Sequence, residues 1–323
     1  MSSPADHILE TLRKATTPVS GELLAAQLGI SRAAIFKHVE ALRARGYTIA
    51  SEHAQGYVLK ATPDRLDATE LGPRLTGSWR AIEWHQEIDS TQRRARELAQ
   101  EGSAEGAVVI AEAQTAGRGR LGRTWHSPPG RNVYASILLR PALPPSAVPQ
   151  LALVVGLGVA EAVETLGLEP RLKWPNDVLL DGRKAVGILT EMEAELERVR
   201  LVIVGIGVNV NLDRGELPAY LRDTATSLKI AAGRPIDRVG FTAALLASVE
   251  RTYGRFMRDG FAGLKAGWDA RDALRGRRVA REVGGATVEG VADGVDDDGA
   301  LRLVGDGGAV QRVVAGEVAI AES

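Results

Sequence analysis

The spacing of apolar residues divides the chain into three parts. In residues 1–62, apolar side chains recur every three or four positions, which is typical of amphipathic helices. In the middle part, apolar runs of strand length are mixed with longer helical segments. The final part contains only short apolar runs separated by Gly and Asp, which is typical of a small β structure. We therefore predict an α+β protein with three domains, at residues 1–62, 63–274 and 275–323.

The first part predicts a winged helix-turn-helix. One helix begins at Pro4, a second spans Gly21–Leu28, and a third spans Arg32–Arg45 behind the capping residue Ser31. Two short strands are expected within Tyr47–Lys60. Helix, short turn with Gly, helix and hairpin, in this order, are typical of a DNA-binding domain. A winged helix used only for protein contacts is the alternative.

The middle part predicts a mixed sheet with helices. The expected strands are Ala81–Ile88, Ala107–Ala113, Val133–Leu139, Arg171–Trp174, Val178–Leu180, Ala185–Glu191 and Leu201–Asn209. The expected helices are Thr91–Glu101, Val148–Leu166, Arg238–Arg258 and Phe261–Leu274. Because these strands and helices do not alternate strictly, a regular Rossmann winding is not expected. In the last part we expect a small β barrel with strands at Arg278–Val283, Ala286–Ala292, Leu301–Val304 and Val310–Val314.

Composition excludes several kinds of chemistry. The 323 residues include no cysteine, so disulfides, thiolate metal sites and thiol nucleophiles are excluded. The five histidines are scattered without ligand spacing, and we therefore expect no metal site built from histidine. The N-terminal segment lacks the apolar core of a signal peptide. The apolar stretch Leu151–Val163 is shorter than a membrane span and predicts a buried helix. We expect a cytoplasmic protein without membrane association.

The net charge of −1 hides regions of opposite sign. Residues 1–62 carry seven Lys and Arg against five acids, and residues 112–140 carry five arginines against one acid. From residue 271 onward, ten acids stand against seven bases. A polyanionic partner for the first part is therefore compatible with the sequence.

The segment Gln114–Asn132 is unusually rich in glycine and arginine. Gly117, Gly119 and Gly122 match the pattern G-x-G-x-x-G. A dinucleotide fingerprint needs a helix directly after these glycines, and the prolines that follow here prevent one. The pattern therefore does not indicate a dinucleotide site.

Arginines stand between these glycines, at Arg118, Arg120 and Arg123. Glycine lets backbone N–H groups approach an anion, and the arginine fork suits phosphate and carboxylate. We expect the loop to be mobile without a ligand and to close over a bound one. A solvated basic turn and a nucleic-acid contact are the alternatives.

Three further motifs carry polar groups near the ends of predicted elements. Lys173–Asp177 (KWPND) and the nearby Lys184 would suit nucleotidyl transfer, since lysine neutralises phosphate and an acid can hold Mg²⁺. Gly205–Asn211 (GIGVNVN) offers asparagine amides to a base edge. Asp89–Thr91 offers hydroxyls to a small polar ligand. An exposed lysine, an ordinary turn and a plain helix N-cap are the respective alternatives.

Taken together, these motifs resemble the bifunctional biotin–protein ligase and biotin operon repressor family. GRGRLGRTW at Gly117–Trp125 resembles its adenylate-binding loop, and KWPND and GIGVNVN are similar to its second and third signatures. The segment Ser20–Leu42 resembles its DNA-reading helix-turn-helix, and the last part resembles its SH3-like domain. The resemblance covers nearly the whole chain and implies a central mixed-sheet domain of the biotin/lipoate ligase type.

The resemblance implies an ATP-dependent, AMP-forming biotin–acetyl-CoA-carboxylase ligase. Biotin and ATP would form biotinyl-5′-adenylate, and biotin would then pass to one lysine of a biotin carboxyl carrier protein of an acyl-CoA carboxylase. ATP, Mg²⁺ and biotin as substrate are implied, and no tightly bound prosthetic group. The alternatives are a lipoate–protein ligase-like enzyme and a non-enzymatic, ligand-sensing transcription regulator. The arginine–glycine loop and the reading head favour biotin, and Lys184 favours catalysis.

The resemblance also implies the site residues. The catalytic residues would be Lys184, Arg118, Arg120 and Asp177. The biotin-binding residues would be Ser90, Thr91, Gln92, Gln114, Arg118, Gly119, Arg120 and Lys184. The residues binding ATP and the adenylate would be Gly117, Arg118, Arg120, Arg123, Trp125, Asn132, Lys173, Asn176, Lys184 and Asn209.

Several of these residues have individual expected roles by resemblance. Lys184 would lie over the junction of carboxylate and phosphate. Asn209 would contact adenine, and Trp125 would cover it. Asp177 would assist the incoming lysine or hold Mg²⁺. Gln92 stands where the family often has asparagine, so a longer amide would have to make this contact here.

For the repressor half, the resemblance implies that two protomers bind a palindromic operator of a biotin-synthesis locus. Biotinyl-5′-adenylate would be the corepressor that promotes pairing of the protomers. The dimer surface would be the edge of the central sheet. The DNA-binding residues would be Ser31, Arg32, Ala33 and Lys37.

Overall fold

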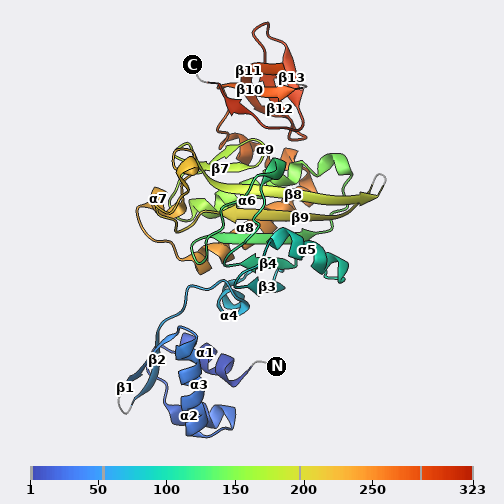
Figure 1. Ribbon diagram of the computed structural model, residues 1–323. Coiled ribbons are helices and arrows are strands. Elements are labelled where there is room, and N and C mark those ends of the chain that lie inside the picture. Colours follow the sequence, from blue (N-terminus) through green and yellow to red (C-terminus); the bar gives the residue numbers. More distant parts are fainter. Residues whose placement is uncertain (1–2, 53–54, 196–197, 284–285, 322–323) are drawn as a thin grey trace. The chain divides into compact units, whose positions relative to one another are not determined.

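The chain folds as two compact units, Met1–Arg65 and Leu66–Ser323. The computed structural model describes residues 3–52, 55–195, 198–283 and 286–321. Figure 1 colours the chain from the blue N-terminal end to the red C-terminal end. The boundary between the units falls near the expected end of the first domain. The expected boundary between residues 274 and 275, inside the second unit, stays a prediction.

Three helices and a two-stranded sheet form the first unit. Its elements are α1 (Pro4–Lys14), α2 (Gly21–Leu28), α3 (Arg32–Ala44), β1 (Thr48–Glu52) and β2 (Gly56–Ala61). Ser3, Ser20 and Ser31 cap the helices, since each side-chain oxygen accepts a backbone N–H of the first turn. Gly29 ends α2 in the left-handed conformation, with φ 65°. The predicted winged helix-turn-helix is confirmed.

A seven-stranded mixed sheet forms the centre of the second unit. Its strands are β3 (Ile82–His85), β4 (Val108–Ala111), β5 (Val133–Leu139), β6 (Arg171–Lys173), β7 (Asp177–Leu180), β8 (Arg183–Glu195) and β9 (Arg198–Val208). They lie in the order β3-β4-β5-β9-β8-β7-β6. The strands β3 and β4 pair in parallel, and the other neighbours pair antiparallel. The predicted mixed sheet is confirmed, with β3 shorter and with β8 and β9 longer than expected.

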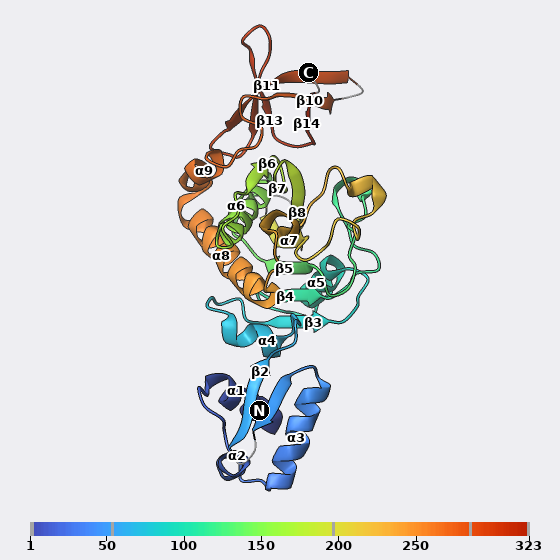
Figure 2. The same cartoon turned by 90° about the vertical axis from the view of Figure 1, so that its left-hand side faces the viewer.

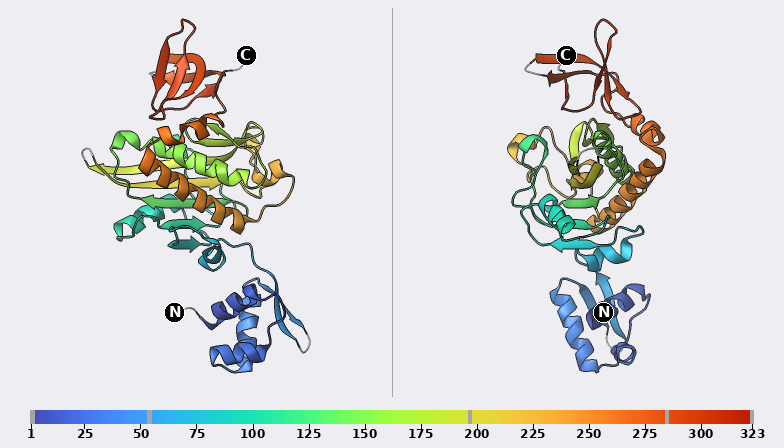
Figure 3. Two further views of the ribbon diagram at one scale, coloured as in Figure 1. Left: turned by 180° about the vertical axis from the view of Figure 1, so that it is seen from behind. Right: turned by 90° about the vertical axis from the view of Figure 1, so that its right-hand side faces the viewer.

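Helices cover both faces of this sheet (Figure 2; Figure 3). The helices of this unit are α4 (Ala68–Leu71), α5 (Thr91–Gln100), α6 (Gln150–Glu164), α7 (Leu228–Ala232), α8 (Arg238–Asp259) and α9 (Ala262–Asp269). Helices α6 and α8 pack on one face, where Val108 and Ile110 join their apolar cluster. Helix α5 packs on the other face, where Val109 meets Ala95 and Ala99. The alternation of side chains along β4 therefore supplies both cores.

Helix α6 carries only apolar residues from Leu151 to Ala160. Together with the turn before it, residues 145–164 are long and apolar enough to cross a membrane by length and composition. However, 72% of an 18-residue stretch within this segment is buried inside the structure. A single such helix is weak evidence for a membrane span, because the core helix of a soluble protein has the same length and composition. Leu151 and Val163 are fully buried, which confirms the predicted core helix.

Five short strands form an antiparallel sheet near the C-terminus. They are β10 (Arg278–Val283), β11 (Ala286–Val295), β12 (Leu301–Val304), β13 (Val310–Val313) and β14 (Ala319–Ile320), in the order β13-β12-β11-β10-β14. The sequence predicts four of them, whereas β14 is too short to show a pattern.

The helix expected at Phe261–Leu274 is shorter, because α9 ends at Asp269. The chain beyond this end pairs with β6 instead of continuing the helix. The backbone N–H of Leu172 donates to Arg271 O, and that of Ala273 donates to Leu172 O. Pairing with a distant strand is not visible in the local apolar pattern.

Candidate active site

A cavity of about 510 Å³ lies over the α5 face of the seven-stranded sheet. Gly187 of β8 pairs directly with Gly207 of β9 at its floor. Since side chains alternate along a strand, Gly205 and Gly207 continue the row that Ile203 begins beneath α5. Because these glycines carry no side chain, the apolar packing between α5 and the sheet is interrupted here and leaves the cavity free. Its volume lies in the range usual for small-molecule sites.

Two large side chains lie on this glycine floor. A methyl group at Gly205 would come within 3.0 Å of the Gln92 side chain, and one at Gly207 within 2.5 Å of the Trp125 indole. A methyl group at Gly187 would meet the same indole at 2.8 Å. The glycines are therefore required by the close approach of these two side chains.

The start of α5 brings unpartnered polar groups into the cavity. Ser90 is the N-cap residue of α5, but its side chain makes no capping hydrogen bond. Its Oγ is buried without a partner, as are Gln92 Oε1 and Trp125 Nε1. Such atoms are rare in folded proteins, and these three residues line one cavity. They are suited to hydrogen-bond a polar ligand.

Hydrogen bonds tie Thr91 at the start of α5 to Gln114 in the segment after β4. Gln114 Oε1 accepts hydrogen bonds from the Thr91 backbone N–H at 2.9 Å and from its hydroxyl at 3.1 Å. On the other side, Gln114 Nε2 donates to Ser127 Oγ at 3.1 Å. These bonds fix the orientation of the Gln114 amide at the cavity wall.

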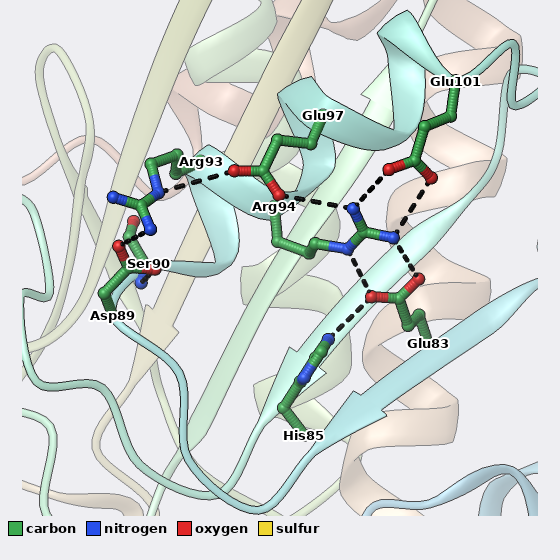
Figure 4. A network of polar contacts seen from close by, with 8 residues as sticks. All are labelled: Glu83, His85, Asp89, Ser90, Arg93, Arg94, Glu97 and Glu101. Atoms are coloured by element: carbon green, nitrogen blue, oxygen red, sulfur yellow. Dashed lines mark hydrogen bonds and ion pairs between the residues drawn. The ribbon is translucent and has the colours of Figure 1, made fainter.

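An ion-pair network holds α5 against β3 (Figure 4). Arg94 donates to Glu83 through Nε at 2.6 Å and Nη2 at 3.1 Å, and to Glu101 through Nη1 at 2.7 Å. His85 Nε2 contacts the same Glu83 carboxylate at 2.7 Å. The hydrogen bonds from Arg94 hold the pKa of Glu83 below its ordinary value of 4.5. The network fixes the helix whose first turn places Ser90.

Residues near the C-terminus hold the arginine–glycine loop. Arg123 forms two bonds with the Glu317 carboxylate, at 3.0 and 2.6 Å. Arg120 Nη2 donates to the backbone carbonyl of Gly316 at 3.1 Å. Between them, Leu121 is exposed and adopts φ 55°, a conformation that costs about 1–2 kcal/mol for a residue with a side chain. The expected mobility of the loop without ligand stays a prediction.

Lys184 stands beside an acid and an indole. Its Nζ lies 2.7 Å from Asp177 Oδ1 and 5.5 Å from the centroid of the Trp125 ring. Asp177 is opposite Gly187 in the pairing of β7 with β8. The loop reaches the same place, since Arg120 Nη1 donates to Asn176 Oδ1 at 3.1 Å. Cations from two separate segments thus converge on one end of the cavity.

The predicted site residues converge, with two exceptions. All of the predicted catalytic, biotin-binding and nucleotide-binding residues line the cavity except Gly117 and Asn132. The roles implied for these residues by resemblance stay predictions. The sequence analysis did not identify Gly187 and Glu317 as site residues. It noted the glycines of GIGVNVN but did not predict that they form the floor of the cavity. Glycine in an otherwise apolar strand is the signal that could have found Gly187.

The helix-turn-helix unit exposes a different set of residues. Arg32, Ala33 and Lys37 are exposed on α3, as DNA contact requires. The Ser31 hydroxyl oxygen accepts the backbone N–H of Ala34, so this residue caps the helix. Phe36 is 53% exposed on the same helix and is absent from the prediction.

The described part of the chain contains no group of three or more His, Asp or Glu that could hold a metal ion. A Mg²⁺ ion that enters this cavity with a nucleotide would take most of its ligands from phosphate and water.

Three family models match the chain. The model of an HTH domain matches residues 5–58, that of the biotin protein ligase C terminal domain matches residues 275–320, and that of the biotin/lipoate A/B protein ligase family matches residues 84–209. The bifunctional ligase/repressor BirA of Bacillus subtilis (strain 168) is 39% identical over 288 residues, which cover 88% of this chain and 89% of that protein. The chain belongs to the biotin/lipoate A/B protein ligase family. The resemblance identified in the sequence is confirmed.

Two further proteins that are similar to this chain support the same family membership. The bifunctional ligase/repressor BirA of Escherichia coli (strain K12) is 34% identical over 289 residues, covering 89% of this chain and 88% of that protein. The biotin protein ligase from Aquifex aeolicus in complex with biotin and ATP matches with a TM-score of 0.65 and 32% identity, covering 75% of this chain and 99% of that chain. The predicted fold class is thus confirmed: an N-terminal helix-turn-helix, a central mixed-sheet ligase domain and a small C-terminal β domain.

Proposed function

We propose that this member of the biotin/lipoate ligase family activates biotin with ATP and transfers it to a lysine of a biotin carboxyl carrier protein. In the first step, a biotin carboxylate oxygen attacks the α-phosphorus of ATP, and pyrophosphate leaves. In the second step, the lysine amine attacks the acyl carbon of biotinyl-5′-adenylate and loses a proton. AMP leaves with the electrons of the broken C–O bond. When bound to the nucleotide, Mg²⁺ would supply neutralisation of phosphate charge.

The observation that carries this proposal is the meeting of cations and unpartnered neutral polar groups in one cavity. Carboxylate and phosphate repel each other, and the positive charges of Lys184, Arg118 and Arg120 offset that repulsion. The neutral groups, Ser90 Oγ and Gln92 Oε1, suit a ligand with both N–H and C=O groups, such as the ureido ring of biotin. We assign Lys184 as the main electrostatic catalyst.

The remaining assignments follow the same geometry. Asp177 holds the Lys184 ammonium at 2.7 Å, and its carboxylate is available to accept the proton of the incoming lysine. Asn209 has a fixed amide, since its Nδ2 donates to Thr226 O at 3.0 Å. We assign it to the adenine edge, with Trp125 over the base. We assign Gln114, Thr91 and Gly119 to biotin, and Arg123, Lys173 and Asn176 to the nucleotide. Gly117 and Asn132 do not line the cavity, so we assign them to the support of the nucleotide site from behind.

Lipoate is the competing substrate, because lipoate ligases share this family. The dithiolane ring of lipoate has no N–H group, so it would leave the Gln92 and Ser90 oxygens unpartnered. The direct test is exchange of labelled pyrophosphate into ATP. We expect exchange that requires biotin and that lipoate does not support. Exchange supported equally by lipoate, or independent of either acid, would contradict the proposal.

The chain is also a biotin-responsive transcriptional repressor that uses biotinyl-5′-adenylate as corepressor. We propose that two protomers pair through the edge of the central sheet and bind a palindromic operator. Ser31, Arg32, Ala33 and Lys37 would contact the DNA at the start of α3. Because binding of adenylate and operator is then coupled, each must favour the other. Operator affinity should rise with biotin plus ATP and fall steeply with salt; equal affinity with and without biotin would contradict this role.

The boundaries and the location complete the proposal. We propose that the ligase domain spans residues 63–274 and that the C-terminal domain spans residues 275–323. We propose a cytoplasmic protein without membrane association, since a bacterial operator and an acyl-CoA carboxylase carrier are both cytoplasmic partners.

A further inference from the structure

A buried ion pair lies outside the residues assigned to the reaction. Glu112 directly follows β4, and Arg238 is the first residue of α8. Arg238 Nη1 lies 2.7 Å from Glu112 Oε2, and their side chains are 0% and 4% exposed. Withdrawing two charges from water is costly, and apolar side chains of similar volume often stabilise a core as well or better. The pair therefore needs an explanation other than stability.

The Glu112 carboxylate is held from a second side. Its Oε1 accepts hydrogen bonds from the backbone N–H of Leu66 at 3.0 Å and from the Trp84 indole at 3.2 Å. Leu66 is the first residue of the second unit and is fully buried. Both carboxylate oxygens are thus used, so the group is fixed in position and orientation.

Arg238 extends from this carboxylate toward the cavity. Its Nη1 also donates to the backbone carbonyl of Asn132 at 3.0 Å. The side-chain Oδ1 of Asn132 accepts the backbone N–H of Val210 at 3.0 Å, and its Nδ2 lies 3.5 Å from Asn209 Oδ1. Asn209 lines the cavity. Asn132 Nδ2 also donates to Tyr134 OH at 3.0 Å, and Tyr134 lines the cavity as well. Polar contacts therefore lead from Glu112 through Arg238 and Asn132 to two side chains that line the cavity.

We propose that Glu112 and Arg238 are positioning residues for the nucleotide end of the cavity, where they set the place of Asn209 through Asn132. The inference rests on the proposed function, in which Asn209 contacts adenine. Neither member of the ion pair lines the cavity, so neither touches the nucleotide. Their effect is expected on the binding of ATP and not on the binding of biotin.

The test compares two variants that separate folding from positioning. In Arg238→Met, Glu112 becomes an unpaired buried charge, and the Asn132 carbonyl loses its donor. We expect a lower Tm and a KM for ATP raised about tenfold. The double variant Glu112→Gln/Arg238→Met removes the charge but keeps an acceptor for Leu66 and Trp84. We therefore expect its Tm to recover while its KM for ATP stays raised.

Biotin binding and a matched pair serve as controls. The Kd for biotin, measured by calorimetry, should be unchanged in both variants. The double variant Glu164→Gln/Arg271→Met removes an Arg–Glu pair that does not line the cavity, and it should leave the KM for ATP unchanged.

Two results would overturn the inference. The first concerns the Glu112→Gln/Arg238→Met variant. If its KM for ATP returns to the parental value together with its Tm, the ion pair has only a structural role. The other is an unchanged KM for ATP in either variant. If Arg238→Met alone fails to fold, the double variant decides. Biotin transfer by the parental chain is measured first, so failure of the proposed function appears separately.

Discussion

Replacement of Lys184 by methionine tests the electrostatic role assigned to this residue. Methionine fills most of the volume of the lysine stem but carries no charge. In the structure the Lys184 ammonium lies 2.7 Å from Asp177, at the end of the cavity that the loop arginines approach. The variant therefore removes a positive charge from the place where we propose that carboxylate and phosphate meet, and it leaves the Asp177 carboxylate without its Lys184 partner.

The size of the effect follows from the distance and the exposure. Two unit charges about 4 Å apart at an effective dielectric constant of about 20 interact with about 4 kcal/mol. The Lys184 side chain is 34% exposed and shares its charge with Asp177, so we reduce this value by about half. Since about 1.4 kcal/mol corresponds to a tenfold change in rate, adenylate formation should slow about thirtyfold.

The assay is the release of pyrophosphate at saturating biotin and ATP. The control is Lys229→Met, because Lys229 pairs with Asp213 at 2.7 Å but does not line the cavity. We expect Lys229→Met to react at the parental rate. Parental pyrophosphate release by a folded Lys184→Met protein would refute the electrostatic role.

Three further predictions concern the floor, the loop and the α5 network. Gly207→Ala would place a methyl group 2.5 Å from Trp125 and should slow adenylate formation about tenfold, whereas Gly215→Ala, which meets no neighbour, should not. Arg120→Gly removes two hydrogen bonds of the loop and should speed release of labelled adenylate; an unchanged rate would contradict closure. Glu83→Gln should lower the Tm at pH 7. Because the pKa of Glu83 is held below 4.5 in the folded chain, the difference should be full above pH 4.5 and disappear as the pH falls through that folded pKa. A difference that persists in acid would exclude an ionic origin.

Local patterns were sufficient to predict most of the elements. The strand β5 is confirmed at both ends, because an apolar run is bounded by Asn132 and by Arg140 followed by proline. Helix α2 is confirmed at both ends as well, since Ser20 and Gly29 have the capping roles that their types favour. In such segments the information that determines the element lies within a few residues.

Contacts between residues far apart in the chain could not be predicted from the sequence. Glu112 and Arg238 are 126 positions apart, and no periodicity relates them. The pairing of Arg123 with Glu317 has the same character. Ser90 illustrates a different difficulty. Its position before a helix is typical of an N-cap residue, so the sequence could not distinguish that role from ligand binding. The structure favours the ligand role, since the hydroxyl makes no capping bond and is buried in the cavity wall.

The central claim is that this cavity joins biotin, and not lipoate, to a carrier protein. The most direct measurement is the mass of a carrier domain after incubation with the chain, ATP and either acid. The account predicts that the carrier gains the mass of one biotinyl group, on a single lysine, and gains nothing with lipoate. A carrier that gains a lipoyl group, or that stays unmodified with biotin and ATP, would contradict it.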